Sequence, residues 1–272
     1  MLVSWRIKPD IVVLLALALA LVLWTARAYP LLSVALVLAS LALSGACLWS
    51  SRTLLGTRAA WIFLATAVVL GWLAEQCGAT LGWFFGSYHY TEVLGPRLGA
   101  VPLAIPLMWF GLCYVGFLMA CLVLWRQPVP PASGWKAGAL AALLAAMIVT
   151  AFDLGADPYF VYVLKAWIMT EKDGGWFGET VKGFEGWMIV SFTIVVLFQA
   201  IARPQAGVVA GAQARRAAIV PILVYAGLLV FQVALTQPVA LRIIAFYAMG
   251  IPCVIALMAW SQWARQLPGG SA

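Results

Sequence analysis

Charged residues are what this sequence has least of. They make up 9% of its 272 residues, whereas 65% are hydrophobic and the mean hydropathy is +1.03. A water-soluble globular domain carries about 25% charged residues, so that class is excluded. In a bilayer every backbone polar group must be satisfied internally, and long helices achieve this. We therefore expect an all-α, polytopic transmembrane helical bundle.

Histidine and paired cysteines are also scarce. His89 is the only histidine, which excludes bis-histidine haem ligation, a histidine-rich di-iron centre and a three-histidine zinc site. The five cysteines show no C-x-x-C spacing, so we expect neither a disulfide framework nor a zinc site. No Walker loop, dinucleotide fingerprint or Ser-His-Asp order stands in a credible context. We predict a protein without metal or cofactor.

Long apolar stretches define the expected spans. Each is close to the ~20 residues that cross a ~30 Å hydrocarbon core. We expect eight spans, with seven as the alternative, in a single integral membrane domain over residues 1–272. The stretches cover residues 11–26, 31–49, 59–74, 101–125, 137–152, 187–202, 217–235 and 239–263.

Lysine and arginine predict the orientation, because cytoplasmic loops carry an excess of both. Under eight spans, ten basic residues fall on one face and six on the other. Both termini should then be cytoplasmic, in a bacterial or archaeal cell membrane. The long connections 77–100 and 154–186 should lie together on the outer face. Anionic lipid explains the net charge of +7, so no nucleic-acid partner is expected.

Eight of the nine acidic residues fall in three short patches. A carboxylate at a helix centre costs about 2.5–3.5 kcal/mol on insertion scales, so buried ones are rarely idle. Asp153 and Asp157 stand four apart and share one face if the helix continues between them. Two other interpretations stay open: Glu75 as a helix-end carboxylate at the interface, and Asp157 as the cap of a helix that starts at Pro158. The third patch is Glu171, Asp173, Glu179 and Glu185.

Aromatic residues crowd both long connections, in segments 82–95 and 157–167. One interpretation is an aromatic belt at headgroup depth without a catalytic role. The other is a set of rings that line a binding groove.

Several motifs resemble a known family. The sequence GWFFGSYHY at 82–90, followed by Val101-Pro102 and Ile105-Pro106-Leu107, is similar to the first signature of the CruF-type carotenoid biosynthesis membrane proteins, which are carotenoid hydratases. The resemblance covers residues 71–187. Thr180 and Gly183 depart from the family pattern, which has proline and asparagine there. The second signature is matched at Asp153-Leu154, Asp157-Pro158, Trp167, Gly178, Phe184 and Gly186-Trp187.

The resemblance implies acid-catalysed addition of water to the terminal C=C of an acyclic carotenoid such as lycopene, giving a tertiary alcohol. Such chemistry needs a protonated carboxyl group, a held water and ring faces for a carbocation. We assign Asp153 as the general acid and Asp157 or Glu75 as the group that positions water. The bilayer and other enzymes of the carotenoid pathway are the remaining expected partners. The expected substrate-binding residues are Trp83, Phe85, Tyr88, His89, Tyr90, Trp109, Trp167, Trp176 and Trp187.

Three alternatives remain open. A carotenoid cyclase would share the acid but exclude water. A prenyltransferase-like enzyme would use D-x-x-x-D with magnesium, but it needs a second acidic cluster that the sequence lacks. A non-enzymatic carotenoid or lipid carrier would use the acidic pair for proton relay or packing.

Overall fold

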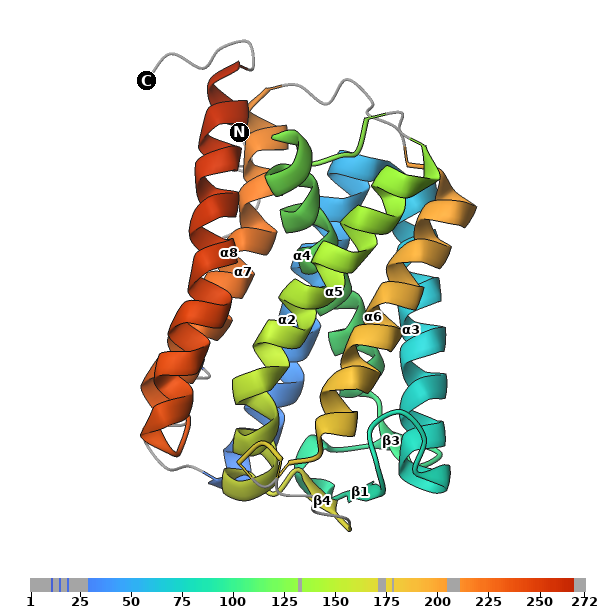
Figure 1. The fold of residues 1–272 in the computed structure, drawn as a ribbon, viewed down its shortest axis with the longest axis vertical. Coiled ribbons are helices and arrows are strands. Elements are labelled where there is room, and N and C mark those ends of the chain that lie inside the picture. The colour runs from blue at the N-terminus through green and yellow to red at the C-terminus, as the bar shows by residue number, and fades with distance from the viewer. Residues whose placement is uncertain are drawn as a thin grey trace, which may run out of the picture.

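The computed structural model describes residues 29–131, 134–170, 175–177, 179–204 and 211–266, together with positions 11, 15 and 19. Seven helices in this part of the chain are long and apolar enough to cross a membrane. They alternate in direction and form one bundle (Figure 1). The predicted all-α polytopic bundle is confirmed. Apart from the three isolated positions, the predicted span 11–26 lies outside the described residues. The helices are α2 (Tyr29–Leu55), α3 (Thr57–Leu81), α4 (Ala104–Trp125), α5 (Trp135–Pro158), α6 (Val181–Ala202), α7 (Ala212–Leu235) and α8 (Val239–Gln266).

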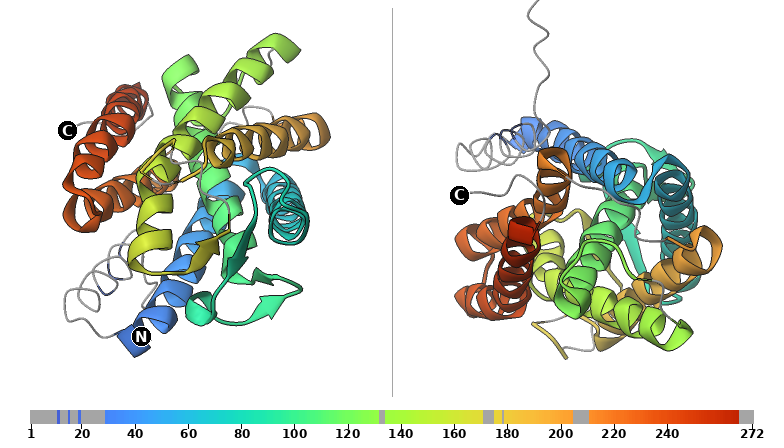
Figure 2. Two further views of the ribbon diagram at one scale, coloured as in Figure 1. Left: turned by 60° about the horizontal axis from the view of Figure 1, so that its bottom comes forward. Right: turned by 90° about the horizontal axis from the view of Figure 1, so that it is seen from above.

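Helix α4 forms the centre of the bundle. It has no charged residue and is apolar on all sides, which is typical of a helix buried all round. It contacts each of the other six helices, and seen from above it lies inside their ring (Figure 2). Its residues from Trp109 to Leu122 are all buried. The first turns of α4 therefore form one wall of any internal space at the end of the bundle where α4 begins.

Several helices extend further than the apolar stretches predict, and the extensions of α3 and α5 carry buried carboxyls. Helix α3 continues past residue 74 to Leu81, and Gly82, whose φ of +68° allows a left-handed turn, caps it. Helix α5 continues through Pro158 into a π-helical turn, η2 (Tyr159–Val163). Asp157 therefore does not cap a new helix, and that interpretation is wrong. The predicted apolar stretches ended just before the carboxylates, because these residues lower the local hydropathy. The backbone nevertheless stays helical through them.

The two long connections meet at one end of the bundle, as predicted. Strand β1 (Tyr88–Tyr90) pairs antiparallel with β4 (Trp167–Met169), so that Tyr90 lies opposite Trp167. Between them in the chain lie a short 3-10 helix, η1 (Glu92–Leu94), and the small hairpin β2 (Arg97–Leu98) and β3 (Val101–Pro102).

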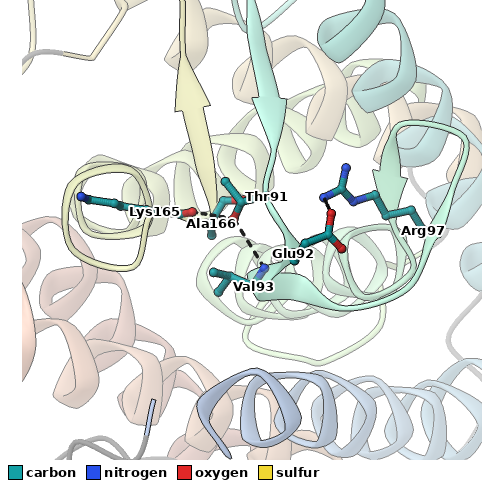
Figure 3. A network of polar contacts seen from close by, with 6 residues as sticks. All are labelled: Thr91, Glu92, Val93, Arg97, Lys165 and Ala166. Atoms are coloured by element: carbon teal, nitrogen blue, oxygen red, sulfur yellow. Dashed lines mark hydrogen bonds and ion pairs between the residues drawn. The ribbon is translucent and has the colours of Figure 1, made fainter. Parts of the chain in front are cut away.

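Thr91 ties the two connections together. Its hydroxyl donates to the carbonyl oxygen of Lys165 at 2.6 Å, and its N–H donates to that of Ala166 at 2.9 Å (Figure 3). The same hydroxyl accepts from the N–H of Val93 at 3.4 Å, which caps η1. One side chain therefore fixes the register of β1 against β4.

Candidate functional site

Glu75 is buried inside the bundle and is only 5% exposed. The Tyr88 and Tyr90 hydroxyls both donate to its Oε2 atom, Tyr90 at 2.7 Å, and the indole of Trp109 donates to Oε1 at 2.9 Å. Glu75 lies six residues, or roughly 9 Å, before the end of α3. It is therefore not a helix-end carboxylate at the interface. Three donors around both oxygens suit the ionised form, which only accepts.

The alternation of strand β1 selects the rings that face Glu75. Tyr88 and Tyr90 are buried on one side of the strand, and His89 between them is exposed on the other. Burial, and next the negative charge of Glu75, raise the pKa of both phenols well above the usual range. Both phenols therefore remain donors throughout the physiological pH range.

Gly78 allows the loop that contains Phe85 and Tyr88 to pack directly on α3. A Cβ atom at this position would lie 2.9 Å from Phe85 Cδ2 and 2.9 Å from the Tyr88 hydroxyl. Either contact is too short to exist, so a larger residue would push Tyr88 away from Glu75.

A second group of carboxyls lies on and beside α5. Asp153 is 1% exposed, Asp157 is 9% exposed, and Glu179, from the segment before α6, is completely buried. Asp157 and Glu179 lie close enough to interact electrostatically. Two carboxyls buried together disfavour ionisation of both, because like charges repel strongly away from water. A proton on one of them would relieve this repulsion, and the indole of Trp167 donates to Asp157 at 3.0 Å.

Contacts of Trp176 with α5 and with Glu179 place Glu179 near Asp157. Pro158 has no N–H, so the carbonyl oxygen of Leu154, four residues earlier, loses its helical partner. The Trp176 indole donates to that oxygen at 2.9 Å. Trp176 also forms a bridge with Glu179, because each N–H of the pair donates to the other's carbonyl oxygen. The proline thus creates the docking point that brings Glu179 over α5.

Thr180 joins the segment that contains Glu179 to the loop that contains Phe85. It caps α6 by accepting from the N–H of Gly183 at 3.2 Å. Its hydroxyl also donates to the carbonyl oxygen of Phe85 at 3.3 Å. The threonine that departs from the family pattern therefore has a local structural role.

A cavity of about 30 Å³ separates Glu75 from Asp157. This volume has room for about two water molecules, since one water needs about 10–15 Å³ by the same measure. Every transmembrane helix from α3 to α6 contributes to the wall. The lining residues are Glu75, Phe85, Tyr88, Tyr90, Ile105, Met108, Asp157, Trp167, Met169, Gly183 and Trp187.

No cation neutralises these carboxyls within the described ranges. The ion pair found there, Arg97 with Glu92 at 2.7 Å, lies in the loop outside the cavity (Figure 3). Among the same residues, no group of three or more histidine, cysteine or acidic side chains is arranged to hold a metal ion. Protons and hydrogen-bond donors therefore have to stabilise the buried acids.

Residues 28–258 match the family described as carotenoid biosynthesis protein. The chain belongs to this family. A comparison with curated proteins and one with solved structures each found no match. Membership supports a role in carotenoid biosynthesis, and the seven apolar helices make the chain an integral membrane protein.

In this member of the carotenoid biosynthesis protein family, most of the rings selected from the sequence surround the cavity. Trp109 lies behind the wall, where it bonds Glu75 and stacks on Trp187 with ring centroids 4.4 Å apart. Trp176 serves the backbone of α5 instead. Trp83 is 57% exposed, and neither it nor the exposed His89 lines the cavity among the described residues. The selected rings that do line it are Phe85, Tyr88, Tyr90, Trp167 and Trp187.

Glu179 is the residue that sequence reasoning did not select as part of the site of this carotenoid biosynthesis protein. It was one of four acids in a glycine-rich segment, and nothing local separated it from Glu185, which is exposed on α6. One sequence feature could have identified Glu179: GWFG at 175–178 nearly repeats GWFFG at 82–86, and Glu179 follows it directly.

Proposed function

We propose that this protein adds water to the terminal isopropylidene C=C of an acyclic carotenoid and so produces a tertiary alcohol. The observation that carries the proposal is the small cavity with Asp157, which interacts with Glu179, on one side and Glu75, held by three donors, on the other. Hydration of an alkene needs an acid and a negative group that face each other across the reacting atoms.

The proton moves first. Asp157 donates its proton to the less substituted alkene carbon, the π electrons form the new C–H bond, and a tertiary carbocation remains. A water molecule beside Glu75 attacks the cation and forms the C–O bond. The proton that this water releases returns to the Asp157–Glu179 pair, so one water is consumed and the acid is restored.

The walls of the cavity suit a carbocation. The rings of Tyr90 and Trp167 pack edge to face with centroids 5.8 Å apart, and Trp187 on α6 forms another part of the cavity wall. A desolvated ring face contributes about 2 kcal/mol toward a nearby cation. The carboxyl of Glu75, held by three donors, lies on the side from which water attacks.

The geometry favours Asp157 over Asp153 as the acid. Asp157 lines the cavity, whereas Asp153, one turn earlier, is not among the described residues of the lining. We therefore assign Asp153 to a position behind the acid, buried on α5 one turn before Asp157. Gly183 leaves space in the same wall: a Cβ atom there would lie 4.0 Å from Asp157 Oδ2. The family's asparagine would occupy that space, and here water or the substrate end group fills it.

The direct test is expression of this chain in a host that accumulates lycopene, followed by mass analysis of the pigments. We expect masses increased by one or two waters, with the visible absorption bands unchanged because the conjugated system is not touched. An isomer of equal mass with a shortened chromophore would show cyclisation. Unchanged lycopene bound to the purified protein would show a carrier.

We also propose that the site lies at the outer end of the bundle, with both termini cytoplasmic. Among the described basic residues, eight lie at the opposite end and four at the site end. The eight are Arg52, Arg58, Arg126, Lys136, Arg203, Arg215, Arg216 and Arg265, and the four are Arg97, Lys165, Lys182 and Arg242.

Thiol labelling of intact cells tests this orientation. His89→Cys places a thiol at an exposed position of the site end, and Lys136→Cys places one at an exposed position of the other end. A membrane-impermeant thiol reagent should label the first and spare the second, and the unmodified chain gives the background of its own cysteines. The reverse pattern would place the site on the cytoplasmic side.

A further inference from the structure

A second cavity, of about 100 Å³, lies beside the site among α2, α4, α5 and α7. Its walls are almost entirely apolar, and it is partly open to the exterior of the bundle. The two polar side chains in its lining direct their donors to the backbone: Ser40 to the Leu36 carbonyl at 2.8 Å, and Gln232 to the Phe152 carbonyl at 2.7 Å. The cavity therefore suits a hydrocarbon.

Met108 belongs to the lining of both cavities. It lies on the first turns of α4 and is partly exposed to these internal spaces. Ala156 lines the apolar cavity, and its neighbour Asp157 lines the acidic one. The two spaces are thus separated by one unbranched, flexible side chain and one turn of α5.

The acidic cavity admits no more than the reacting end group of a carotenoid. A space of about 30 Å³ holds about two waters, so the remaining polyene has to leave it. On the loop side, Thr91 and Thr180 tie together the segments that form the wall, and the lining residues there are Phe85, Tyr88, Tyr90, Trp167 and Met169. Past Met108 the path is apolar and leads toward the outside of the bundle.

We propose that the apolar cavity holds the polyene chain next to the reacting end and that Met108 separates the chain from the acid. This inference rests on the proposed carotenoid substrate. Its occupant is a linear polyene, which is narrow enough to pass between helices and has no polar group that the walls would leave unsatisfied.

The test is the amount of lycopene that stays bound to the purified protein, measured by visible absorption per mole of protein. Ala39 lines the apolar cavity from α2. Ala39→Phe should lower the retained lycopene about tenfold or more, because the phenyl ring takes the space that the chain needs, and Ala39→Val should give an intermediate loss. Leu38→Phe is the matched control, since Leu38 is 52% exposed on the outer side of the same helix.

The outcomes separate this inference from the proposed function. Equal retention by Ala39→Phe and Leu38→Phe, or no retention by the unmodified protein, would overturn the apolar cavity as the chain site, whatever product forms. Retention that depends on Ala39 without any hydrated product would support the chain site and contradict hydration. The graded Ala39→Val variant and the elution profile in detergent show that a loss comes from the cavity and not from misfolding.

Discussion

Asp157→Asn is expected to lower hydration of lycopene by about a hundredfold to ten-thousandfold, the range that a general acid contributes. The amide has no proton acidic enough for an alkene carbon. It keeps the shape of the carboxyl, and its oxygen can still accept from the Trp167 indole. Expression and melting temperature in detergent should therefore stay close to those of the unmodified protein. The measurement is product formed per mole of purified protein.

Two variants serve as controls for this result. Glu185→Gln removes an exposed carboxyl from the same region of α6 and should leave conversion unchanged. Asp153→Asn should cost less than Asp157→Asn, because Asp153 lies behind the cavity wall. If Asp153→Asn abolished conversion and Asp157→Asn did not, the acid would be Asp153, as the sequence alone had suggested.

Glu75→Gln is expected to reduce both activity and stability. The glutamine amide presents a donor where the carboxylate accepts, and three buried donors converge on that group. Each buried donor left without an acceptor costs about 1–3 kcal/mol. We expect a lower melting temperature in detergent together with a loss of conversion of about a hundredfold, since the cation and the water lose their negative neighbour.

Glu92→Gln is the matched control for Glu75. Glu92 is another acidic residue at the site end of the bundle, but its side chain is exposed and its ion pair with Arg97 lies at the surface, where such pairs contribute about 0–1 kcal/mol. It should change neither measurement. A Glu75→Gln protein with normal stability and full conversion would contradict the role assigned to this carboxylate.

Part of the site could be predicted from the sequence. Asp153 and Asp157 were expected on one helix face, and helix α5 places both inside the bundle. Glu75 and the rings of segment 82–90 were expected near them, and strand β1 directs Tyr88 and Tyr90 at Glu75. These inferences succeeded because spacing along a helix or strand decides which side chains share a face.

Other parts depended on contacts between distant segments. Trp83 and His89 lie in the same aromatic-rich segment as Tyr88 and Phe85, and residue type alone does not distinguish them. In the structure, a turn directs Trp83 outward and the alternation of strand β1 directs His89 outward. Glu179 reaches Asp157 because Pro158 frees the Leu154 carbonyl for Trp176. Sequence periodicity carries no information on such pairings, since Trp83, Trp176 and Glu179 lie outside the helices.

The sequence by itself determined the class of this protein. Apolar stretches of about 20 residues can satisfy their backbone groups in a bilayer only as helices, and few charges interrupt them. The tertiary structure alone decided which carboxyls face each other across the cavity and which apolar space adjoins them. Helix formation is local, whereas the chemistry of buried acids depends on neighbours that only packing brings within hydrogen-bonding distance.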